Sequence, residues 1–424
     1  MRPHPLALTL LFTASAFAAD PWTDLRPVYE DLHAHPELSG KETETAKKLA
    51  TLLKAAGFTV TEGVGGTGIV GILENGKGPV VMLRTELDAL PVEEKTGLPY
   101  ASTVKVTDAS GAPVPVMHAC GHDIHMTSLV GAATLLARAK ARWRGTLVLV
   151  GQPAEESGNG ALNMIHDSFL SRFPKPDYAL AFHDKAELPA GTIAWGPGFV
   201  LANVDSVDIT IFGRGGHGSR PESTVDPIVI AARTITALQT IVARETSPFD
   251  AAVVTVGSIH GGAARNVIPD QVTLQLTIRS YEPAVRQRVL AAIERIAKAE
   301  AAAGDAPREP EVKVVGATAA TYNDPALSKR VAAALAAAFG QDRVVGTQPV
   351  MGGEDFGEFG KAAKAPSFMF WVGGVPASKW SEVNGDAAKL PSLHSALWAP
   401  DPEPTVKAGA GALTVAALEL LAKP

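Results

Sequence analysis

The chain has 424 residues and a formal net charge of −6 at pH 7, from 38 Lys and Arg against 44 Asp and Glu. With 46% hydrophobic and 19% charged residues, its composition is typical of a globular protein of two or three domains. The mild acidic excess and the lack of a basic patch with interleaved aromatic residues argue against a nucleic-acid partner.

The first residues resemble an export signal. A basic start at Arg2 precedes an apolar run from Leu6 to Phe12 and an Ala-rich exit at Ala16–Ala19. This pattern predicts a cleavable signal peptide over residues 1–19 and a secreted or periplasmic protein. Later apolar runs are too short to cross a bilayer, so we expect no membrane partner. A single cysteine cannot form an internal disulfide, which leaves Cys120 free to bind a metal.

Helices and apolar strands alternate up to about residue 202. Helical spacing of apolar residues predicts two helices between 23 and 56, separated at His35-Pro36-Glu37 and ended by Gly57. Strands are expected at 67–74, 79–85, 146–150 and 178–182, helices at about 124–140 and 161–170, and a loop at 107–116. This alternation is typical of an α/β domain, with a mostly parallel sheet flanked by helices.

Metal-capable side chains follow three of these strands. Glu86 and Asp88 follow the strand at 79–85, Glu155 and Glu156 follow the strand at 146–150, and His183 follows the strand at 178–182. Open α/β sheets place their sites at the carboxyl ends of strands. The sequence therefore predicts a site at that edge of the sheet.

The pattern changes near Ala202. Polar and apolar residues alternate over 204–212, as in a half-exposed strand. From 203 to 314 the expected order is β-α-β-β-α-β, which predicts an inserted α+β domain of the ferredoxin-like type. Helices at 325–339 and about 404–422 and a strand at 367–371 then continue the first domain. We therefore predict a catalytic domain of residues 20–202 and 315–424, interrupted by a second domain of residues 203–314.

The segment from Met117 to His125 holds the only cysteine and three of the eleven histidines. Thiolate and imidazole are strong ligands of divalent metals, and Cys120-Gly121-His122 can aim both side chains into one site from a turn. A lone cysteine is otherwise a small buried hydrophobe. The neighbouring histidines favour the metal or catalytic role.

The adjacent Glu155 and Glu156 suggest a division of labour, in which one carboxylate binds metal and the other takes a proton from water. The alternative is a solvated surface pair, but the preceding apolar strand and Gln-Pro-Ala turn favour the site. With His394 as a late candidate, the chain has enough ligands for two ions that share a bridging group. The full candidate set is Cys120, His122, Glu156, His183 and His394. Such a pair lowers the pKa of a bound water and provides hydroxide at neutral pH.

Further motifs accompany these residues in the same order along nearly the whole chain. They are His35-Pro36-Glu37-Leu38-Ser39, Asp88-Ala89-Leu90-Pro91, Met117 through His125, Gln152-Pro153-Ala154-Glu155-Glu156, Gly215-Gly216-His217, Asp226-Pro227, Asn266-Val267-Ile268-Pro269, Gly353-Glu354-Asp355-Phe356 and His394. In these segments the chain resembles the aminoacylase/carboxypeptidase clan of di-metal peptidases. Within the clan it is similar to the amidohydrolase branch, which contains hippurate hydrolases and N-acyl-amino-acid and auxin-conjugate amidohydrolases.

The resemblance implies a role for each matching residue of the first domain. Cys120 bridges two ions, whose shells are completed by His122, Glu156, His183 and His394. Glu155 is the general base. Asp88 is a carboxylate that orients a histidine ligand.

The resemblance also implies roles for the inserted domain. His217 and Asn266 polarise the scissile carbonyl or hold the substrate carboxylate, and His217 acts either in its own subunit or across a dimer. The same domain forms the dimer in many relatives, so a homodimer is expected.

Several positions depart from the family pattern and leave substrate specificity open. Glu86 stands where the family usually has Asp, Asp184 stands where an apolar residue is common, and 107–116 is lengthened. His125 is either structural or an orienting residue. We predict structural roles for the remaining conspicuous residues, which are His33, His118, Trp371, Trp380 and Trp398.

The sequence thus predicts a metal-dependent amidohydrolase that cleaves the amide bond of N-acyl or aminoacyl amino acids by attack of metal-bound hydroxide. A dipeptidase or carboxypeptidase with the same mechanism is the nearest alternative, and an inactive binding protein on the same fold is another. The thiolate favours zinc, while the oxygen ligands leave manganese and cobalt open. The acyl group and the preferred amino acid are not determined by these residues.

Overall fold

The computed structural model describes residues 21–107 and 110–422, so the predicted signal peptide lies outside the described residues. The chain divides into two compact units. Unit 2 comprises Gly198–Tyr322 and Gln348–Glu358, and unit 1 comprises the rest. The second unit thus extends beyond the expected 203–314 and includes a segment that we had expected in the catalytic domain.

Strand pairing explains these wider bounds. The strand β9 (Gly198–Leu201) pairs with β16 (Thr321–Asn323), which ties the start of the insertion to its end. The later segment joins them because Leu201 bridges Val350 and Ala202 donates a hydrogen bond to the carbonyl of Gly352. The sequence pattern does not reveal such short pairings.

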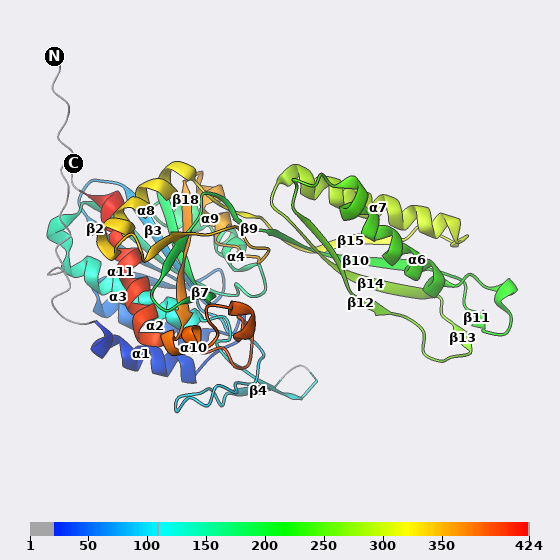
Figure 1. The fold of residues 1–424 in the computed structure, drawn as a ribbon, viewed down its shortest axis with the longest axis horizontal. Helices are drawn as coiled ribbons and strands as arrows, with labels where there is room; N and C mark the ends of the chain where they lie inside the picture. The colour runs from blue at the N-terminus through cyan, green and yellow to red at the C-terminus, as the bar shows by residue number, and fades with distance from the viewer. Residues whose placement is uncertain (1–20, 108–109, 423–424) are drawn as a thin grey trace, which may run out of the picture. The chain divides into compact units, whose positions relative to one another are not determined.

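Unit 1 is built on an eight-stranded mixed sheet with helices (Figure 1). Its strands, in sheet order, are β1 (Thr59–Val64), β2 (Gly68–Asn75), β6 (Gly145–Gln152), β3 (Val80–Glu86), β7 (Tyr178–Pro189), β18 (Ser367–Val375), β8 (Ile193–Trp195) and β17 (Val344–Gly346). The central run β6-β3-β7-β18 is parallel throughout. All nine residues of β18 are buried, as expected of a parallel strand covered on both faces.

The helices of unit 1 cover this sheet. They are α1 (Trp22–Ala34), α2 (Thr43–Ala55), α3 (His122–Arg138), α4 (Gly160–His166), α5 (Phe169–Arg172), α8 (Pro325–Phe339), α10 (Ala377–Glu382) and α11 (Pro402–Leu421), with α9 (Gly357–Ala363) at the border with unit 2. The central pair α3 and α11 packs so closely that a Cβ added at Gly131 would lie 2.8 Å from the Cβ of Ala410. This contact fixes α3, whose first turn carries His122.

Several features of unit 1 differ from the sequence-based expectations. The helix expected at about 161–170 is divided into α4 and α5. The expected loop at 107–116 contains a short hairpin, β4 (Lys105–Thr107) with β5 (Pro113–Pro115). The strand β1 was not expected. The strand β7 continues to Pro189, because it pairs with β18 well beyond His183, so His183 lies within the strand rather than after it.

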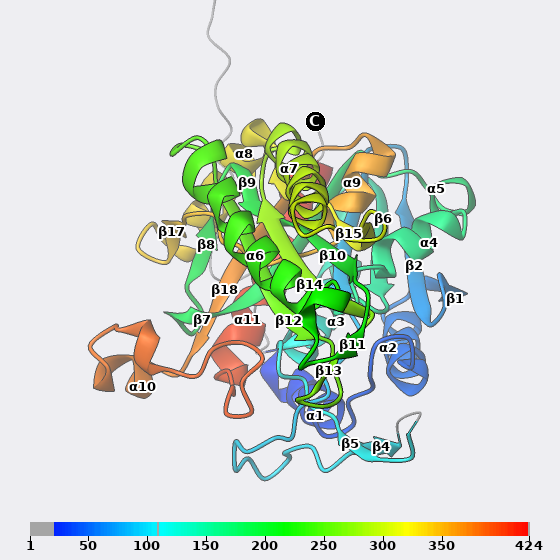
Figure 2. The ribbon, with the colours of Figure 1, turned by 90° about the vertical axis from the view of Figure 1, so that its right-hand side faces the viewer.

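Unit 2 contains a four-stranded antiparallel sheet of the order β12-β14-β10-β15. Its elements are β10 (Asn203–Phe212), α6 (Pro227–Thr240), β12 (Ala252–His260), β14 (Gln271–Ser280), α7 (Pro283–Ala303) and β15 (Glu311–Thr318). Figure 2 shows α6 and α7 side by side against this sheet. The strand order is that of the predicted ferredoxin-like arrangement. The helix α6 is followed directly by a π-helical turn at Ile241–Glu245.

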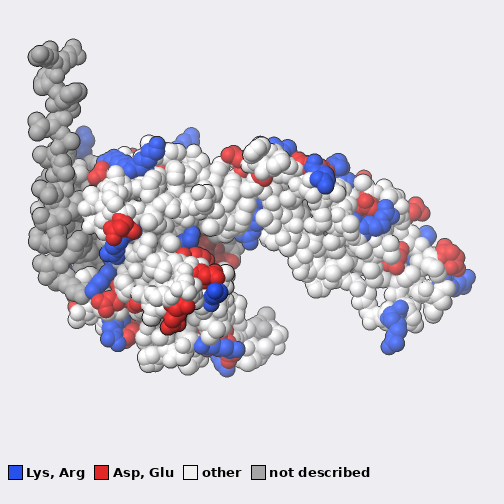
Figure 3. All heavy atoms as spheres, in the orientation of Figure 1, with Lys and Arg blue, Asp and Glu red and all other residues white. Residues whose placement is uncertain are grey.

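Many charged side chains lie on the surface of the protein. On the face drawn in Figure 3, basic and acidic residues are interspersed and much of the surface is uncharged. Exposed pairs such as Arg288–Asp250 and Arg295–Glu245 are typically worth less than about 1 kcal/mol each. No helix among residues 21–107 and 110–422 is long and apolar enough to span a membrane.

Candidate active site

The parallel strands β6, β3 and β7 bring the predicted site residues to one edge of the sheet. Because these strands are adjacent and parallel, their carboxyl ends lie together. Glu86 ends β3, and the turn with Glu155 and Glu156 follows β6. The start of α3 joins this edge, since Leu90 and Met117 exchange backbone hydrogen bonds.

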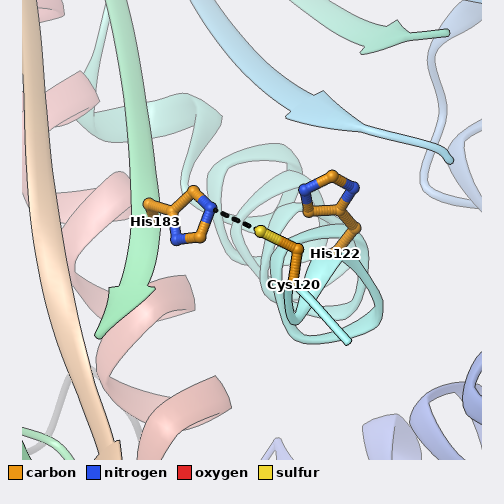
Figure 4. Close-up of side chains that lie close together, drawn as sticks. All are labelled: Cys120, His122 and His183. Atoms are coloured by element: carbon orange, nitrogen blue, oxygen red, sulfur yellow. Dashed lines mark hydrogen bonds between the residues drawn. The ribbon is translucent and has the colours of Figure 1, made fainter. Parts of the chain in front are cut away.

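Cys120 lies at the centre of a cluster of candidate ligands. Its Sγ is 3.4 Å from His183 Nε2 and 3.2 Å from His394 Nε2. Figure 4 shows the sulfur directed toward His183, with His122 on the adjoining turn. Cys120 belongs to two groups of closely spaced ligand atoms, one with His122 and His183 and the other with Glu156 and His394. A ligand common to two groups suits a bridging position.

A backbone hydrogen bond places His394 in this cluster. Its amide donates to the carbonyl of Ala119 at 2.8 Å, and its Nε2 lies 3.5 Å from Glu156 Oε1. His394 adopts a positive φ of 66°, which is costly for a residue with a side chain. Its imidazole is half-exposed, so the cluster is open to solvent on this side.

Glu155 and Glu156 are presented by a strained turn. Ala154 before them has a φ of 51°, in the left-handed region that disfavours residues with a Cβ. The buried carboxylate of Glu42 accepts a hydrogen bond from the Ala154 amide at 2.8 Å and so helps to hold the turn. His122 Nε2 lies 4.0 Å from Glu155 and 3.9 Å from Glu156. The sequence analysis did not single out Glu42, and no local pattern marks it.

Asp88 lies beside His122 and behind the glutamate pair. His122 Nδ1 is 2.8 Å from the Asp88 carbonyl and 3.4 Å from its carboxylate. Asp88 Oδ2 also accepts hydrogen bonds from the hydroxyl of Ser39 and the amide of Glu156. Since His122 Nδ1 donates to Asp88, Nε2 is the ring atom directed at the cluster. This geometry fits the orienting role expected of Asp88.

The electrostatics of the cluster suit a cation. Burial raises the pKa of Cys120 well above its ordinary value, and Glu156 and Glu155 raise it further. Burial acts to lower the pKa of His122, but Asp88 and Glu86 outweigh it and raise the pKa to about 9. A bound metal replaces the protons on such ligands and neutralises the surrounding carboxylates.

Two buried atoms of this cluster also lack hydrogen bonds. His122 Nε2 and Glu156 Oε1 have no hydrogen-bond partner within the described part of the chain. Buried polar atoms are normally paired. With sulfur, imidazole and carboxylate donors in reach, the residues fit one or two divalent ions.

A second layer of buried charge lies beneath His183. His125 Nδ1 is 3.0 Å from Glu86 Oε2, and its Nε2 is 3.2 Å from Asp184 Oδ1. Arg84 pairs with Glu86 on the far side. Burial raises the pKa of Asp184, but hydrogen bonds from His125 and His183 outweigh burial and lower the pKa to about 2. Glu86, His125 and Asp184 therefore belong to one hydrogen-bonded layer next to the candidate ligands.

His33 lies in a separate buried cluster. Its Nδ1 is 2.6 Å from Asp123 Oδ2 and its Nε2 is 3.0 Å from Glu94 Oε1. Burial acts to lower the pKa of His33, but Asp123 and Glu94 outweigh it and raise the pKa to about 10. The cluster joins α1, the start of α3 and the loop at Glu94, which supports the expected structural role.

His118 differs from the other buried histidines. Both of its ring nitrogens lack a hydrogen-bond partner among the described residues, and burial lowers its pKa to about 4. His118 therefore stays neutral and contributes no charge to the neighbouring clusters.

His217 and Asn266 lie together in unit 2. The short strand β11 (Gly216–His217) pairs with β13 (Val267–Ile268), and the amide of Gly218 donates to the carbonyl of Asn266. Both residues are exposed. A Cβ added at Gly215 would lie 2.7 Å from the carbonyl oxygen of Ile268, so this glycine permits close strand approach.

Arg279 is a cationic residue of unit 2 that the sequence analysis did not single out. It lies on β14, and its Nη1 donates to the carbonyl of Met351. Burial lowers its pKa, and no carboxylate among the described residues pairs with it. A half-buried guanidinium without an acidic neighbour is a candidate for binding an anionic group.

Comparison with known proteins agrees with this geometry. Residues 82–384 match a family model described as "Peptidase family M20/M25/M40". The chain is 38% identical over 346 residues to a hippurate hydrolase of Campylobacter jejuni, covering 79% of this chain and 85% of the relative. It is also 38% identical over 347 residues to thermostable carboxypeptidase 1 of Saccharolobus solfataricus, covering 81% of this chain and 84% of the relative.

A solved structure supports the fold and the type of site. It is a Bacillus subtilis protein described as a dinuclear metal-binding peptidase of the M20 family, with a TM-score of 0.75 and 31% sequence identity. The similarity covers 94% of this chain and 98% of that chain. Metal-dependent hydrolysis is thus the activity of the group to which the chain is similar. The chain belongs to the M20 peptidase family, in its amidohydrolase branch.

Proposed function

We propose that this M20 hydrolase cleaves the amide bond between an acyl or aminoacyl group and an amino acid with a free carboxylate, with two divalent ions bound at Cys120. The observation that carries the proposal is the pair of ligand groups that share Cys120, with Glu155 beside them. One part of the metal pair would be held by Cys120, His122 and His183. The other part would be held by Glu156 and His394. Bound zinc or manganese acidifies a water and polarises a carbonyl, and cobalt could serve likewise.

The protein supplies proton transfer and orientation. Glu155 takes the proton of the attacking water and delivers it to the leaving amine. Asp88 keeps the proton of His122 on Nδ1, so that Nε2 stays available to a metal. His183 is oriented in the same way, since its Nδ1 lies 2.7 Å from the Asp184 carbonyl. The strained turn at Ala154 fixes the direction of Glu155.

Unit 2 would recognise the substrate. His217 would polarise the scissile carbonyl, and Asn266 and Arg279 would hold the carboxylate of the amino acid. Homodimerisation through this unit and export through residues 1–19 complete the proposal. The exposure of His217 and Asn266 supports a role in contacts with a ligand or a partner.

A dipeptidase or carboxypeptidase activity is the second candidate, because a thermostable carboxypeptidase is among the relatives. The test is a hydrolysis screen of N-acyl amino acids against dipeptides, with metal analysis of the same sample. We expect about two ions per chain and faster release of amino acids from N-acyl substrates. Faster cleavage of dipeptides would establish the second candidate. A metal-loaded protein that cleaves neither class would contradict both.

A further inference from the structure

The carboxylate of Asp184 contacts chain segments that carry different candidate ligands. Asp184 is fully buried and follows His183 on β7, and its Oδ1 lies 3.0 Å from His183 Nδ1. Its Oδ2 accepts a hydrogen bond from the indole of Trp398 at 3.1 Å. Trp398 is itself held near His394 by a hydrogen bond from its amide to the carbonyl of Ser395. One side chain thus links the strand of His183 to the segment of His394.

The same carboxylate also contacts the turn that carries Cys120 and His122. Gly121 within this turn has a φ of 76°, and a Cβ added there would lie 2.5 Å from Asp184 Oδ2. The backbone of the turn therefore packs directly on the carboxylate. Any side chain at residue 121 would displace either Asp184 or the turn, so glycine is required here by close approach as well as by conformation.

The far side of Asp184 is fixed by the buried layer described above. His125 Nε2 lies 2.8 Å from the Asp184 amide and 3.2 Å from its Oδ1. Glu86 holds the other ring nitrogen of His125, and Arg84 holds Glu86. A buried carboxylate with this many fixed neighbours has little freedom to move.

We propose that Asp184 is a positioning residue that holds the three ligand-bearing segments together and so sets the affinity for the metal pair. The inference rests on the proposed function only for the identity of the ligands. Its physical basis is preorganisation, because ligands that are already in place lose less entropy when the metal binds. Residues that orient metal ligands typically contribute 10- to 100-fold in metal affinity or activity.

The alternative is that Asp184 only stabilises the fold. Asp205 provides the matched control, because it is also a fully buried aspartate but lies in unit 2. It accepts hydrogen bonds from the half-buried Arg286 at 2.9 Å and the buried Asn203 at 2.8 Å, so its replacement also leaves these donors without their charged partner. We therefore expect both replacements to reduce stability, but only the replacement of Asp184 to change the metal affinity.

The experiment compares Asp184→Asn, Trp398→Phe and Asp205→Asn with the wild-type chain. Zn²⁺ affinity is measured by competition with a chromogenic chelator, and thermal unfolding is followed on the metal-free proteins. We expect Asp184→Asn to weaken Zn²⁺ binding roughly 10- to 100-fold. Trp398→Phe removes only one hydrogen-bond donor and should weaken binding less, and Asp205→Asn should lower the unfolding temperature without a change in affinity.

The result that would overturn the inference is wild-type Zn²⁺ affinity in both Asp184→Asn and Trp398→Phe. If Asp184→Asn does not fold, Trp398→Phe decides alone, because an unchanged affinity there also overturns the inference. Absence of hydrolysis by wild-type protein that binds two ions would contradict the proposed function instead. The affinity comparison would still decide the role of Asp184 in that case.

Discussion

The candidate residues of the two units are held in opposite ways. In unit 1 the sulfur, imidazole and carboxylate groups are mostly buried, and further side chains such as Asp88, Glu42 and Asp184 fix their directions. In unit 2, His217 ends the two-residue strand β11 and Asn266 directly precedes its partner strand β13, and both residues are exposed. Their backbone is held, and His217 Nδ1 accepts a hydrogen bond from the Ser219 amide at 3.1 Å, but both side chains are exposed where a ligand can reach them.

The difference arises because binding metal ions and contacting a substrate need different degrees of support for a side chain. A site for metal ions needs several ligands at fixed distances, so it needs buried support. A residue that contacts a passing substrate needs only a correctly placed backbone. Substitution of the metal ligands in unit 1 should therefore change metal binding and chemistry together, whereas substitution of the exposed His217 or Asn266 in unit 2 should change catalysis alone.

Removing the shared ligand should have the largest effect. In Cys120→Ser a hydroxyl replaces the only thiol, and serine is a much poorer ligand for zinc than thiolate. We expect fewer than two ions per chain and loss of measurable hydrolysis. Metal analysis by mass spectrometry and a turnover assay check this. Ala132→Ser places a hydroxyl elsewhere in the buried part of α3 and should keep both ions. Retention of two ions by Cys120→Ser would show that the sulfur is structural.

Replacing the proposed base should give the next largest effect. Glu155→Gln keeps the shape of the side chain but removes proton acceptance, so kcat should fall roughly 10²- to 10⁴-fold with normal metal content. Glu156→Gln is the matched control and should lose metal as well as activity. Near-normal kcat in Glu155→Gln would contradict its role as base. The pair tests whether adjacent carboxylates have different functions.

The exposed histidine of unit 2 should show catalysis separated from stability. His217→Ala should lower kcat/KM roughly 10²- to 10³-fold, the usual scale for losing one donor to an oxyanion. Its metal content and unfolding temperature should stay near those of the wild type, because the side chain is exposed. His260→Ala, at another exposed histidine of unit 2, should leave kcat/KM unchanged. An equal loss of kcat/KM in both variants would remove His217 from the mechanism.

A mixing experiment decides whether His217 acts within its own subunit. If the protein is a dimer and His217 reaches the partner's site, heterodimers of Glu155→Gln and His217→Ala should recover part of the activity. Native mass spectrometry must first demonstrate subunit exchange. Inactive heterodimers would place His217 in the site of its own subunit.

The prediction for His33 concerns stability and not hydrolysis, because this residue lies outside the proposed metal site. The raised pKa of His33, about 10 against an ordinary value of 6.5, means that its stabilisation is complete below pH 6.5 and is lost as the pH rises toward 10. The lowered pKa values of Asp123 and Glu94 mean that their stabilisation is lost on acidification. His33→Gln should lower the free energy of unfolding by about 3–5 kcal/mol near pH 6, as when a buried ion pair is broken.

Denaturant unfolding of wild type and His33→Gln at several pH values checks this expectation. The difference between the two proteins should shrink between pH 7 and pH 10. A difference that is constant with pH would show that His33 contributes through packing rather than charge. His35→Gln, at an exposed histidine of the same helix end, should show no such trend.

Local sequence patterns account for much of the fold. The apolar run Val80–Leu83 and the alternation in 204–212 predict their strands because burial on two faces or one determines the pattern. Short strand pairings, such as that of β9 and the hairpin of β4 and β5, could not be predicted in this way. A strand of three or four residues is too short to show a clear periodicity of apolar residues. The extension of β7 also escapes it, since the partner strand β18 comes far later in the chain.

The candidate site shows the same limit. Cys120 and His122 stand out because metal-binding residue types are clustered in one short segment, and the glutamate pair stands out because it follows an apolar strand. His394 could be named from the residues only as a late candidate, and the family resemblance alone implied its role as a ligand, since nothing around it differs from a loop histidine. Glu42 and Asp184 act through contacts with Ala154 and Gly121, and such contacts are not visible until the chain is folded.

The single thiol makes the site sensitive to oxidation. Cys120 has no second cysteine within the 424 residues with which to form a disulfide, and its sulfur is almost completely buried. An oxidised Cys120 therefore cannot be rescued internally, and further oxidation to sulfinic acid is irreversible by ordinary thiols. A metal ion that occupies the sulfur shields it from oxidants. Loss of the metal should consequently be accompanied by oxidation of Cys120 and by inactivation. The mass of this one residue would then show whether it has been oxidised.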